Sequence, residues 1–574
     1  MRLPKPLLQL LRRRLRGRFV WVKKPFARAY RQATGDTGYM DWSSLIRKDA
    51  AFWENAVSSS ASGPRVLIGA SLGRYPWEVN FDSTLAVALT LRGARVHVLL
   101  CDAALPGCTP FVLQNIPPGQ NPATAPPPCE LCFPPARAIY NALGLPQHRI
   151  SELITADEAD RCTAEAAALT ISEIETFTQG AVSVGEHAVA GAIRFFGNAD
   201  LASEPHAEPI LRRYFEAALR CTYAVQRLLA THEFRVASGS HGIYVPQGIV
   251  GEVARSRNVR VVNWHQAYRQ KCLLFSDGNT YHKTLLHESS DAWQNIPWTD
   301  AREGETMQYL ESRRFGKSDW IAFHPQPNDD SIGALKKLGV DFARPCVGLL
   351  TNVAWDAQLH YGATPFRDMF EWLLETIAYF AKRPELQLLI RVHPAELTGF
   401  VKSRQPAVSE IAKRFPELPP NVFVIPPEST ISTYDAMSQC DSVIIYATKT
   451  GIELAARGMP IIVAGEAWIR NKGFALDARS KADYFALLDR LPLQQRLDSG
   501  ATTRARKYAY HFFFRRMIPV DFLDGKLRPE INSIRDLLPG RSPGLDVICD
   551  GVLEGTGFVY AAEDQASLEA RATA

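Results

Sequence analysis

Residues 442–464 read SVIIYATKTGIELAARGMPIIVA, and this stretch decides the fold. Two apolar runs, 442–447 and 461–464, are short enough to be strands that are buried on both faces of a sheet. Between them lie a turn rich in Thr and Gly and a segment, 452–457, with apolar residues at helical spacing. A strand, a helix and a second strand in this order predict a β-α-β unit of a parallel sheet.

The same alternation extends along the chain on both sides of this unit. In the second half it predicts strands over 346–351, 386–392 and 421–425 and helices over 366–381 and 434–439. In the first half it predicts strands over 65–70, 94–100, 234–237 and 259–264, a helix over 81–91 and a mainly helical segment over 156–232. We therefore expect an α/β protein with two Rossmann-like, doubly wound domains that face a cleft, with a helical insertion in the first domain. The expected divisions are a basic amphipathic N-terminal arm (1–50), a first domain (51–340), a second domain (341–510) and a C-terminal extension (511–574).

The composition is that of a soluble globular protein. The 574 residues are 46% hydrophobic and 22% charged, which is ordinary, and the length favours two domains. No stretch stays apolar over the roughly 18 residues that a membrane-spanning helix needs. Ten unevenly spaced cysteines do not form a secreted disulfide framework in a chain of this length. We expect a cytoplasmic protein with reduced thiols.

Residues 1–35 contain eleven Lys and Arg residues and no Asp or Glu. Apolar residues recur among them at helical spacing: Leu7, Leu8, Leu11, Leu15 and Phe19. A basic amphipathic helix of this kind suits the anionic inner face of a plasma membrane, and a solvated tail or a helix packed on its own protein is the alternative. No basic patch continues into the folded part, so we do not expect nucleic acid as a partner.

The turn at 448–451 has the features of a phosphate site. The first backbone amides of a helix have no partners within the helix, and its dipole favours an anion there. Thr448 and Thr450 add hydroxyl donors, and Gly451 would allow a close approach of the backbone. Thr450 and Glu453 also have the spacing of a capping box, which explains both residues without a ligand. Both interpretations stay open on the sequence alone.

A basic corner, RVHP at 391–394, ends the predicted strand 386–392. Arg391 can bind phosphate through its fork of donors. His393 can donate a hydrogen bond or transfer a proton near neutral pH, although a single histidine at a strand end is often structural. This corner and the 448–451 turn both follow strands of one predicted sheet, whose carboxyl ends are where ligands bind.

A third candidate element follows the strand 461–464. Residues 465–473 read GEAWIRNKG, and Arg470 and Lys472 are candidates to close over a diphosphate. The alternative is that both are ordinary surface charges. Together the three elements predict a site for a phosphorylated, nucleotide-activated substrate.

The first half of the chain holds further candidate residues for this cleft. Glu78 and Asp82 lie four residues apart on one face of a predicted helix start, where a carboxylate could act as a general base. Acids at a helix start also interact with its dipole, which is the simpler explanation. His241 and His265 each follow a predicted strand and are candidate ligand contacts.

Four of the ten cysteines fall within 32 residues: Cys101, Cys108, Cys129 and Cys132. Thiolates at these positions would suit a structural zinc ion or an iron–sulfur cluster that pins the loop. The irregular intervals and the many prolines of this loop fit equally well with reduced, partly buried thiols. Both interpretations stay open.

Several segments of the second half resemble the bacterial capsule polysaccharide biosynthesis protein family, a group similar to GT-B glycosyltransferases. The resemblance covers roughly residues 345–480 and rests on TNVAWD at 351–356, RVHPAE at 391–396, TGIELAARGMP at 450–460, AG at 464–465 and KGF at 472–474. It implies transfer of a sugar from a nucleotide-sugar donor to a growing capsule or surface polysaccharide. The donor would lie in the second domain, and a glycan or lipid-linked acceptor would lie in the first.

The resemblance also implies roles for individual residues. Arg391, His393, Thr450 and Glu453 would line the donor site, with Glu453 near the ribose hydroxyls, and known capsule transferases for an acidic sugar also use a His-Pro corner. No Asp-x-Asp motif follows a strand, so we expect no cofactor to be required for catalysis. One alternative is a polyol-phosphate transferase of teichoic-acid-like polymers, whose Asp-Tyr-Ser-Ser motif is replaced here by YATKT at 446–450. The other is a non-catalytic capsule assembly or export factor.

Overall fold

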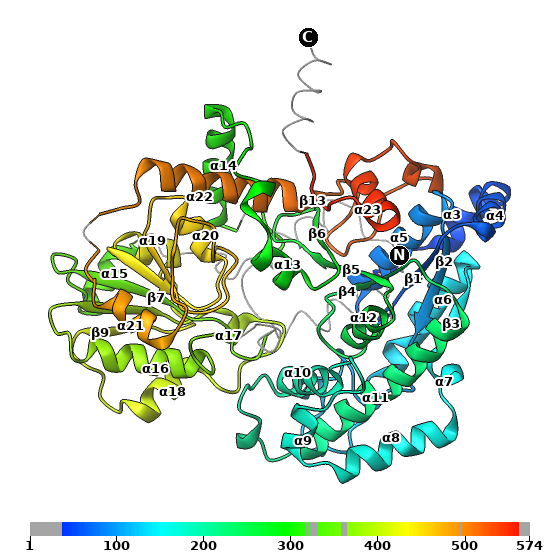
Figure 1. The fold of residues 1–574 in the computed structure, drawn as a ribbon, viewed down its shortest axis with the longest axis horizontal. Helices are drawn as coiled ribbons and strands as arrows, with labels where there is room; N and C mark the ends of the chain where they lie inside the picture. The colour runs from blue at the N-terminus through cyan, green and yellow to red at the C-terminus, as the bar shows by residue number, and fades with distance from the viewer. Residues whose placement is uncertain are drawn as a thin grey trace, which may run out of the picture.

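The computed structural model describes residues 37–69, 71–316, 318–321, 330–356, 364–493 and 495–561. They form two α/β domains, each built around one sheet (Figure 1), which confirms the expected fold class. Most of the predicted N-terminal arm, residues 1–36, lies outside the described residues. Within the described part of the chain, no helix combines the length and the apolar character needed to cross a membrane.

The first domain contains a seven-stranded sheet in the order β13-β6-β5-β4-β1-β2-β3. Its strands are β1 (Arg65–Ile68), β2 (Arg95–Leu100), β3 (Gln147–Arg149), β4 (Val236–Ser240), β5 (Arg260–Gln266), β6 (Cys272–Asp277) and β13 (Met517–Pro519). Strands β1 to β5 run parallel, and Leu67 of β1 lies opposite both His97 of β2 and Ala237 of β4. At one edge, β6 pairs antiparallel with β5, and β13 pairs antiparallel with β6.

The second domain contains a six-stranded parallel sheet in the order β12-β11-β10-β7-β8-β9. Its strands are β7 (Cys346–Leu350), β8 (Gln387–Arg391), β9 (Val422–Ile425), β10 (Ser442–Ile445), β11 (Ile461–Val463) and β12 (Leu476–Asp477). Strands β7, β8, β10 and β11 are buried at every position, which is why they read as continuous apolar runs. The predicted β-α-β unit is present as β10, the helix α20 (Thr450–Ala455) and β11.

Helices surround both sheets (Figure 1). Those up to the end of the helical insertion are α3 (Trp42–Lys48), α4 (Ala50–Ser59), α5 (Pro76–Thr90), α6 (Phe133–Leu143), α7 (Ile150–Leu153), α8 (Ala156–Ala168), α9 (Ile171–Glu175), α10 (Val184–Phe196) and α11 (Ala207–Thr231). Next come α12 (Gln247–Ser256), α13 (Tyr281–His287), α14 (Asp300–Arg313), α15 (Ser331–Lys337), α16 (Met369–Phe380), α17 (Ala395–Thr398), α18 (Ala407–Arg414), α19 (Thr433–Ser438), α21 (Lys481–Leu488), α22 (Ser499–Tyr510) and α23 (Pro543–Glu554). The mainly helical segment expected over 156–232 corresponds to α8 to α11.

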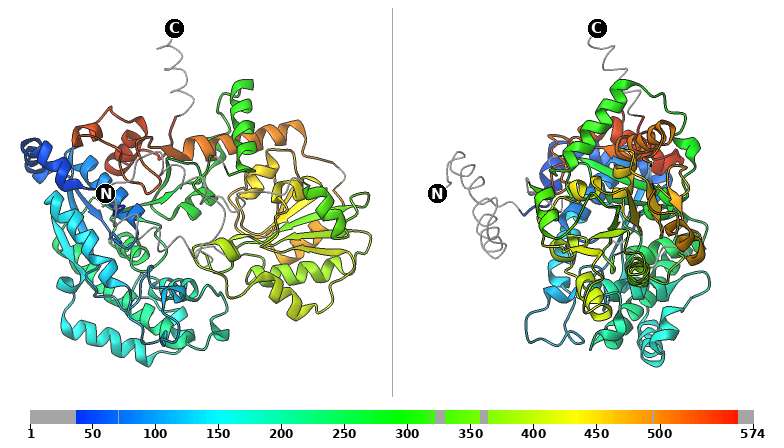
Figure 2. Two further views of the ribbon diagram at one scale, coloured as in Figure 1. Left: turned by 180° about the vertical axis from the view of Figure 1, so that it is seen from behind. Right: turned by 90° about the vertical axis from the view of Figure 1, so that its left-hand side faces the viewer.

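Residues 517–561, the last that the structure describes, return to the first domain, so this part of the predicted C-terminal extension (511–574) is not a separate unit. Strand β13 pairs with β6, with Pro519 opposite Cys272. Helix α23 contributes Leu545 and Ile548 to the same core cluster as Val66 of β1, and it lies beside the blue N-terminal part of the first domain (Figures 1 and 2). The first domain is therefore built from the first and the last parts of the described chain.

Candidate functional site

A cavity of about 550 Å³ lies between the two domains, which is within the usual range for small-molecule sites. The first domain lines it at the start of α5 and beyond the carboxyl ends of β4 and β5, and the second domain lines it beyond the ends of β7, β8 and β10. Both sheets thus direct their carboxyl ends to one cavity, which is where open α/β sheets bind ligands.

The register of the second sheet explains why its two basic elements meet at this cavity. Ile445 of β10 lies opposite Leu350 of β7, and Leu350 lies opposite Arg391 of β8. The turn after β10 and the corner after β8 are therefore two strand spacings apart, which is about 10 Å. Both elements line the cavity, through Thr448 and His393 among others. The structure brings together the two elements that the sequence singled out.

Arg391 lines the cavity, but its guanidinium holds a loop of its own domain. The side chain is 1% exposed. Its Nη1 donates to the carbonyl oxygen of Pro426 (2.5 Å) and its Nη2 to that of Ser429 (3.3 Å), in the loop after β9. Burial lowers the pKa of Arg391 to about 10, so the group is still charged at neutral pH. It supplies positive charge beneath the cavity while it fixes this loop.

His393 is held in one tautomer. Its amide donates to Thr351 Oγ1 (3.0 Å), and its ring Nδ1 accepts from the amide of Ala395 (3.1 Å). An Nδ1 that accepts a hydrogen bond carries no proton, so the neutral ring has its proton on Nε2. The donor that the ring can offer to a ligand is therefore Nε2–H, at a corner stiffened by Pro394.

The turn after β10 presents Thr448, Lys449 and Thr450 to the cavity. Thr448 Oγ1 accepts from the amide of Thr450 (3.3 Å), and the N-cap of α20 is Lys449. Helix α20 has six residues, so its macrodipole is small. The hydroxyl groups and the Lys449 ammonium therefore carry most of the capacity of this turn to bind an anion.

Gly451 is required by packing, which corrects the expectation that it admits a phosphate. It does not line the cavity. A Cβ at this position would lie 2.6 Å from Ile445 Cδ1 and 2.8 Å from Ile469 Cδ1. The missing side chain lets α20 pack closely on the sheet.

Glu453 does not reach the cavity, so the expected contact with ribose hydroxyls and the alternative capping box are both wrong. The residue is 0% exposed, and its carboxylate pairs with Arg313 (3.1 Å) and Lys449 (2.8 Å) and accepts from the Tyr434 hydroxyl. Burial opposes the ionisation of Glu453, but the charges of Arg313 and Lys449 outweigh it and lower its pKa to about 2. The carboxylate holds three side chains that do line the cavity.

Arg470 and Lys472 do not line the cavity either, so the expectation that they close over a diphosphate is wrong. Arg470 donates to the carbonyl oxygen of Gly465 (2.8 Å), within its own loop. Lys472 is 3% exposed and donates to the carbonyl oxygens of Leu286 (3.4 Å) and Glu288. Lys472 thereby ties the loop after β11 to the end of α13.

Glu78 lines the cavity from the start of α5. It is 2% exposed and accepts from the amide of Leu72 (3.2 Å) and from the side-chain amide of Gln247 (2.9 Å). Burial, and then the charge of Asp82, raise the pKa of Glu78 well above its ordinary value. Asp82 does not line the cavity; it accepts from Trp264 Nε1 (2.9 Å), and burial raises the pKa of Asp82 to about 7. Of the two predicted acids, Glu78 can touch a ligand, whereas Asp82 can affect one only through its charge, which raises the pKa of Glu78.

The predicted histidines His241 and His265 both line the wall of the first domain, and the sequence did not indicate a third, His282 of α13. The ring centres of His241 and His265 are 4.9 Å apart. Burial lowers the pKa of His265, and it lowers that of His282 to about 4. At least two of these rings are therefore neutral hydrogen-bonding groups near neutral pH. His282 lies within a helix, where no strand-end pattern marks it.

Arg194 of α10 is a further cavity residue that the sequence did not indicate. Its guanidinium carbon lies 4.6 Å from the centre of the Tyr244 ring, and its Nη1 lies 3.6 Å from Asp356 Oδ1. The Tyr244 hydroxyl donates to the same carboxylate (2.8 Å). Because Asp356 follows β7 of the second domain, these contacts join the helical insertion to the other wall of the cavity.

The four clustered cysteines surround a separate, small cavity. All four are free thiols, and burial raises the pKa of Cys101 to about 12 and that of Cys132 to about 11. Among the described residues, the metal-ligating side chains that come within 4.8 Å of one another in a group of three are histidines. No three of the four cysteine sulfur atoms come that close. A metal site at the cysteines stays a prediction.

Comparison with known proteins supports the family resemblance. Residues 322–495 match the family model described as capsule polysaccharide biosynthesis protein, and no curated protein matches the chain. Similar solved structures include KpsC from Thermosulfurimonas dismutans, a beta Kdo 2,4 transferase (13% identity over 48% of this chain and 79% of that chain, TM-score 0.32). A second KpsC structure from the same organism, beta Kdo 2,7 transferase, has 14% identity over 55% of this chain and 88% of that chain, with a TM-score of 0.30. The UDP-GlcNAc 2-epimerase from Methanocaldococcus jannaschii has 9% identity over 78% of this chain and 99% of that chain, with a TM-score of 0.25. These TM-scores are too low to transfer an activity. The family-model match over residues 322–495 confirms the resemblance seen in the motifs, which cover roughly residues 345–480.

Proposed function

We propose that the protein is a glycosyltransferase that moves a sugar from a nucleotide-sugar donor to a growing capsule or surface polysaccharide. The family match of residues 322–495 supports the role in capsule synthesis. The donor phosphates would lie between the turn at 448–450 and the His393 corner, and the glycan or lipid-linked acceptor would lie against the first domain.

The observation that carries this proposal is the charge of the cavity. Five basic side chains line it: Arg194, Arg313, Arg314, Arg391 and Lys449. Three acidic side chains also line it: Glu78, Asp319 and Asp356. Burial raises the pKa of Glu78 and of Asp319, which reduces their negative charge. Glu453 and Asp435 do not line the cavity, but they pair with Lys449 and Arg314 and offset part of this positive charge. The side chains that line the cavity still carry more positive than negative charge, which favours a ligand with several negative charges, such as a nucleoside phosphate.

The cavity also offers groups for the transfer step. The acceptor oxygen would attack the anomeric carbon while the bond to the leaving phosphate breaks, and a base must take the acceptor proton. Glu78 would be this base, because it faces the cavity from the first domain and its raised pKa makes the ionised carboxylate more basic. His393 Nε2–H and Lys449 would stabilise the charge on the departing phosphate.

We also propose that the enzyme works at the inner face of the plasma membrane. The support is the run of basic residues with apolar residues at helical spacing in residues 1–35. An enzyme held at that surface would remain close to a lipid-linked acceptor.

Donor turnover tests the proposed activity. The full-length protein would be incubated with a panel of nucleotide sugars, and the released nucleotide measured with and without glycan acceptors. We expect one donor to be consumed, and Glu78→Gln to lower the rate by about a hundredfold or more while donor binding is retained. Glu417→Gln, at an exposed position, is the matched control and should behave as the wild type.

Two other outcomes would contradict the proposal. Consumption of a nucleotide-activated polyol in place of a sugar would identify a polyol-phosphate transferase. If the protein neither binds nor consumes any activated sugar, and His393→Ala leaves capsule production intact, a non-catalytic assembly role would be supported.

A further inference from the structure

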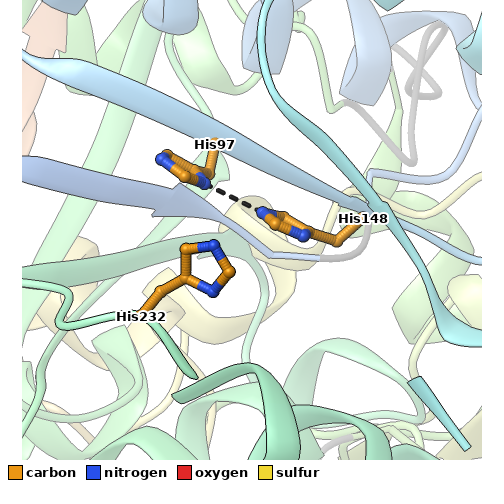
Figure 3. Close-up of side chains that lie close together, drawn as sticks. All are labelled: His97, His148 and His232. Carbon is orange, nitrogen blue, oxygen red and sulfur yellow. Dashed lines mark hydrogen bonds between the residues drawn. The ribbon is translucent and has the colours of Figure 1, made fainter. Parts of the chain in front are cut away.

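Three histidines from separate parts of the first domain meet outside the cavity described above (Figure 3). They are His97 of β2, His148 of β3 and His232, the residue that follows α11. One ring nitrogen from each lies within 4.8 Å of the others. The ring centres are 5.1 Å apart for His97 and His148, 5.3 Å for His97 and His232, and 4.9 Å for His148 and His232. We propose that this histidine cluster binds one divalent transition-metal ion, with zinc as the best fit.

The distances are close to those of a tetrahedral site. His97 Nδ1 and His148 Nε2 are 2.8 Å apart. With Zn–N bonds of about 2.0–2.1 Å, two ligand nitrogens of a tetrahedral site are roughly 3.3–3.4 Å apart. These two rings would separate by about half an ångström, and His232 would approach them. His148 and His232 are partly exposed, so small changes of their side-chain torsions can achieve this.

A hydrogen bond between two of the rings does not satisfy the cluster. His97 is 2% exposed, and its Nε2 has no hydrogen-bond partner. Whichever ring of the pair donates, a polar nitrogen of His97 stays buried and unpaired, which costs free energy. An ion bound at His97 Nδ1 and His148 Nε2 would take the place of this single hydrogen bond and engage both nitrogens at once.

The charges around the cluster allow a cation. Neutral imidazole is the form that binds metal ions, and the burial of His97 favours that neutral form. Arg65 and Arg95, paired across β1 and β2, oppose a cation. The end of α11, a helix of 25 residues, favours one, because His232 is its C-cap and the macrodipole is negative there. A set of imidazoles alone suits zinc, copper or nickel.

A bound ion would be structural. Strand β3 lies at the edge of the first sheet and pairs with β2. None of the three histidines lines the cavity between the domains. An ion held by all three would join the edge strand, its neighbour and the end of α11, with an open position for water on the partly exposed side.

The test is zinc binding by the full-length protein, purified without a histidine tag, stripped by a chelator and titrated with Zn²⁺ in a calorimeter. We expect one equivalent to bind and to raise the melting temperature. The double variant His148→Gln/His232→Gln should bind zinc about a hundredfold or more weakly. Loss of a group that only hydrogen-bonds to a metal ligand already lowers metal affinity by tenfold to about a hundredfold, and this variant loses two ligands. Circular dichroism would verify the fold of this variant, and His287→Gln, at an exposed position, is the matched control.

The cysteine cluster is the competing source of metal ligands, and two further measurements separate it. The variant with Cys129→Ser and Cys132→Ser should keep its equivalent of zinc. Cobalt substituted for zinc should show only the weak visible bands of nitrogen ligation, without the intense near-ultraviolet band of thiolate ligands. Stripped wild-type protein that binds no zinc, or zinc that survives loss of the two histidines and disappears with the two cysteines, would overturn the proposal.

Discussion

The substitution Glu453→Gln removes one negative charge from the interior of the second domain and changes little else. The carboxylate is 0% exposed and lies 3.1 Å from Arg313 Nε and 2.8 Å from Lys449 Nζ. Glutamine has the same shape and can still accept from the Tyr434 hydroxyl. The variant would leave the Lys449 ammonium buried beside the Arg313 guanidinium, with Asp319 as the remaining acid paired to Arg313.

Two independent arguments give a similar loss of unfolding free energy for Glu453→Gln. The pKa of Glu453 is about 2 in the folded protein against an ordinary value of 4.5, and this difference corresponds to roughly 3 kcal/mol of stability. Removing one partner of a buried ion pair costs about 3–5 kcal/mol. In a domain of this size a loss of 3 kcal/mol lowers the melting temperature by about 6–12 °C. Because folding depresses this pKa, the contribution is present above 4.5 and is lost as the pH falls through about 2.

Thermal unfolding of the variant at neutral pH and in acid is the assay. The matched control is again Glu417→Gln, which removes an exposed carboxylate and should unfold with the wild type. We expect the difference between Glu453→Gln and the wild type to shrink in acid. A variant that melts with the control at neutral pH, or a difference that grows in acid, would refute the account of the buried charges.

Three more predictions follow from the geometry. Gly451→Ala should destabilise the second domain by about 1–3 kcal/mol because its Cβ would press on the side chains under α20. Gly304→Ala, in open space on α14, should instead stabilise the protein by up to about 1 kcal/mol. Urea denaturation would compare the two variants, and equal effects on the free energy of unfolding would contradict the packing argument. Asp82→Asn should lower the pKa of Glu78, because Glu78 loses a like charge about 6 Å away. The acidic limb of the pH dependence of kcat/KM should therefore move to lower pH by about one to two units, and a limb that does not move would mean that Glu78 is not the base. Removing residues 1–36 should abolish binding to anionic lipid vesicles in a flotation assay without changing the melting temperature, and binding that persists would disprove the role of the arm.

Most of the second sheet could be predicted from the sequence because β7, β8, β10 and β11 are buried at every position. The run at 442–447 is continuous and apolar, and the strand of the structure, Ser442–Ile445, lies within it. Short or polar strands give no such pattern. Strand β3 (Gln147–Arg149) has three polar residues, and β13 (Met517–Pro519) is a three-residue strand far from its partners in the sequence. Only tertiary contacts place them in a sheet.

The location of the candidate site could be predicted, but the directions of its side chains could not. Parallel strands place the ends of β8 and β10 at one edge, so the His393 corner and the Thr448 turn had to be near each other. Whether an acid at a helix start meets a ligand or a buried cation depends on distant residues. Arg313 of α14 turns Glu453 inward, and Arg194 of the helical insertion reaches the cavity from a helix with no special motif.

The affinity for nucleotides tests the central claim. This claim is that the cavity between the domains holds an anionic donor at the His393 corner and the Thr448 turn. Calorimetry would measure the dissociation constants of uridine, cytidine and guanosine mono- and diphosphates for three proteins: the wild type, the double variant His393→Ala/Thr450→Val, and Arg470→Met. We predict that the wild type binds one of these nucleotides, that the double variant loses about tenfold or more in affinity, and that Arg470→Met, outside the cavity, binds as the wild type does. A wild type that binds none of them, or a double variant with unchanged affinity, would contradict the claim.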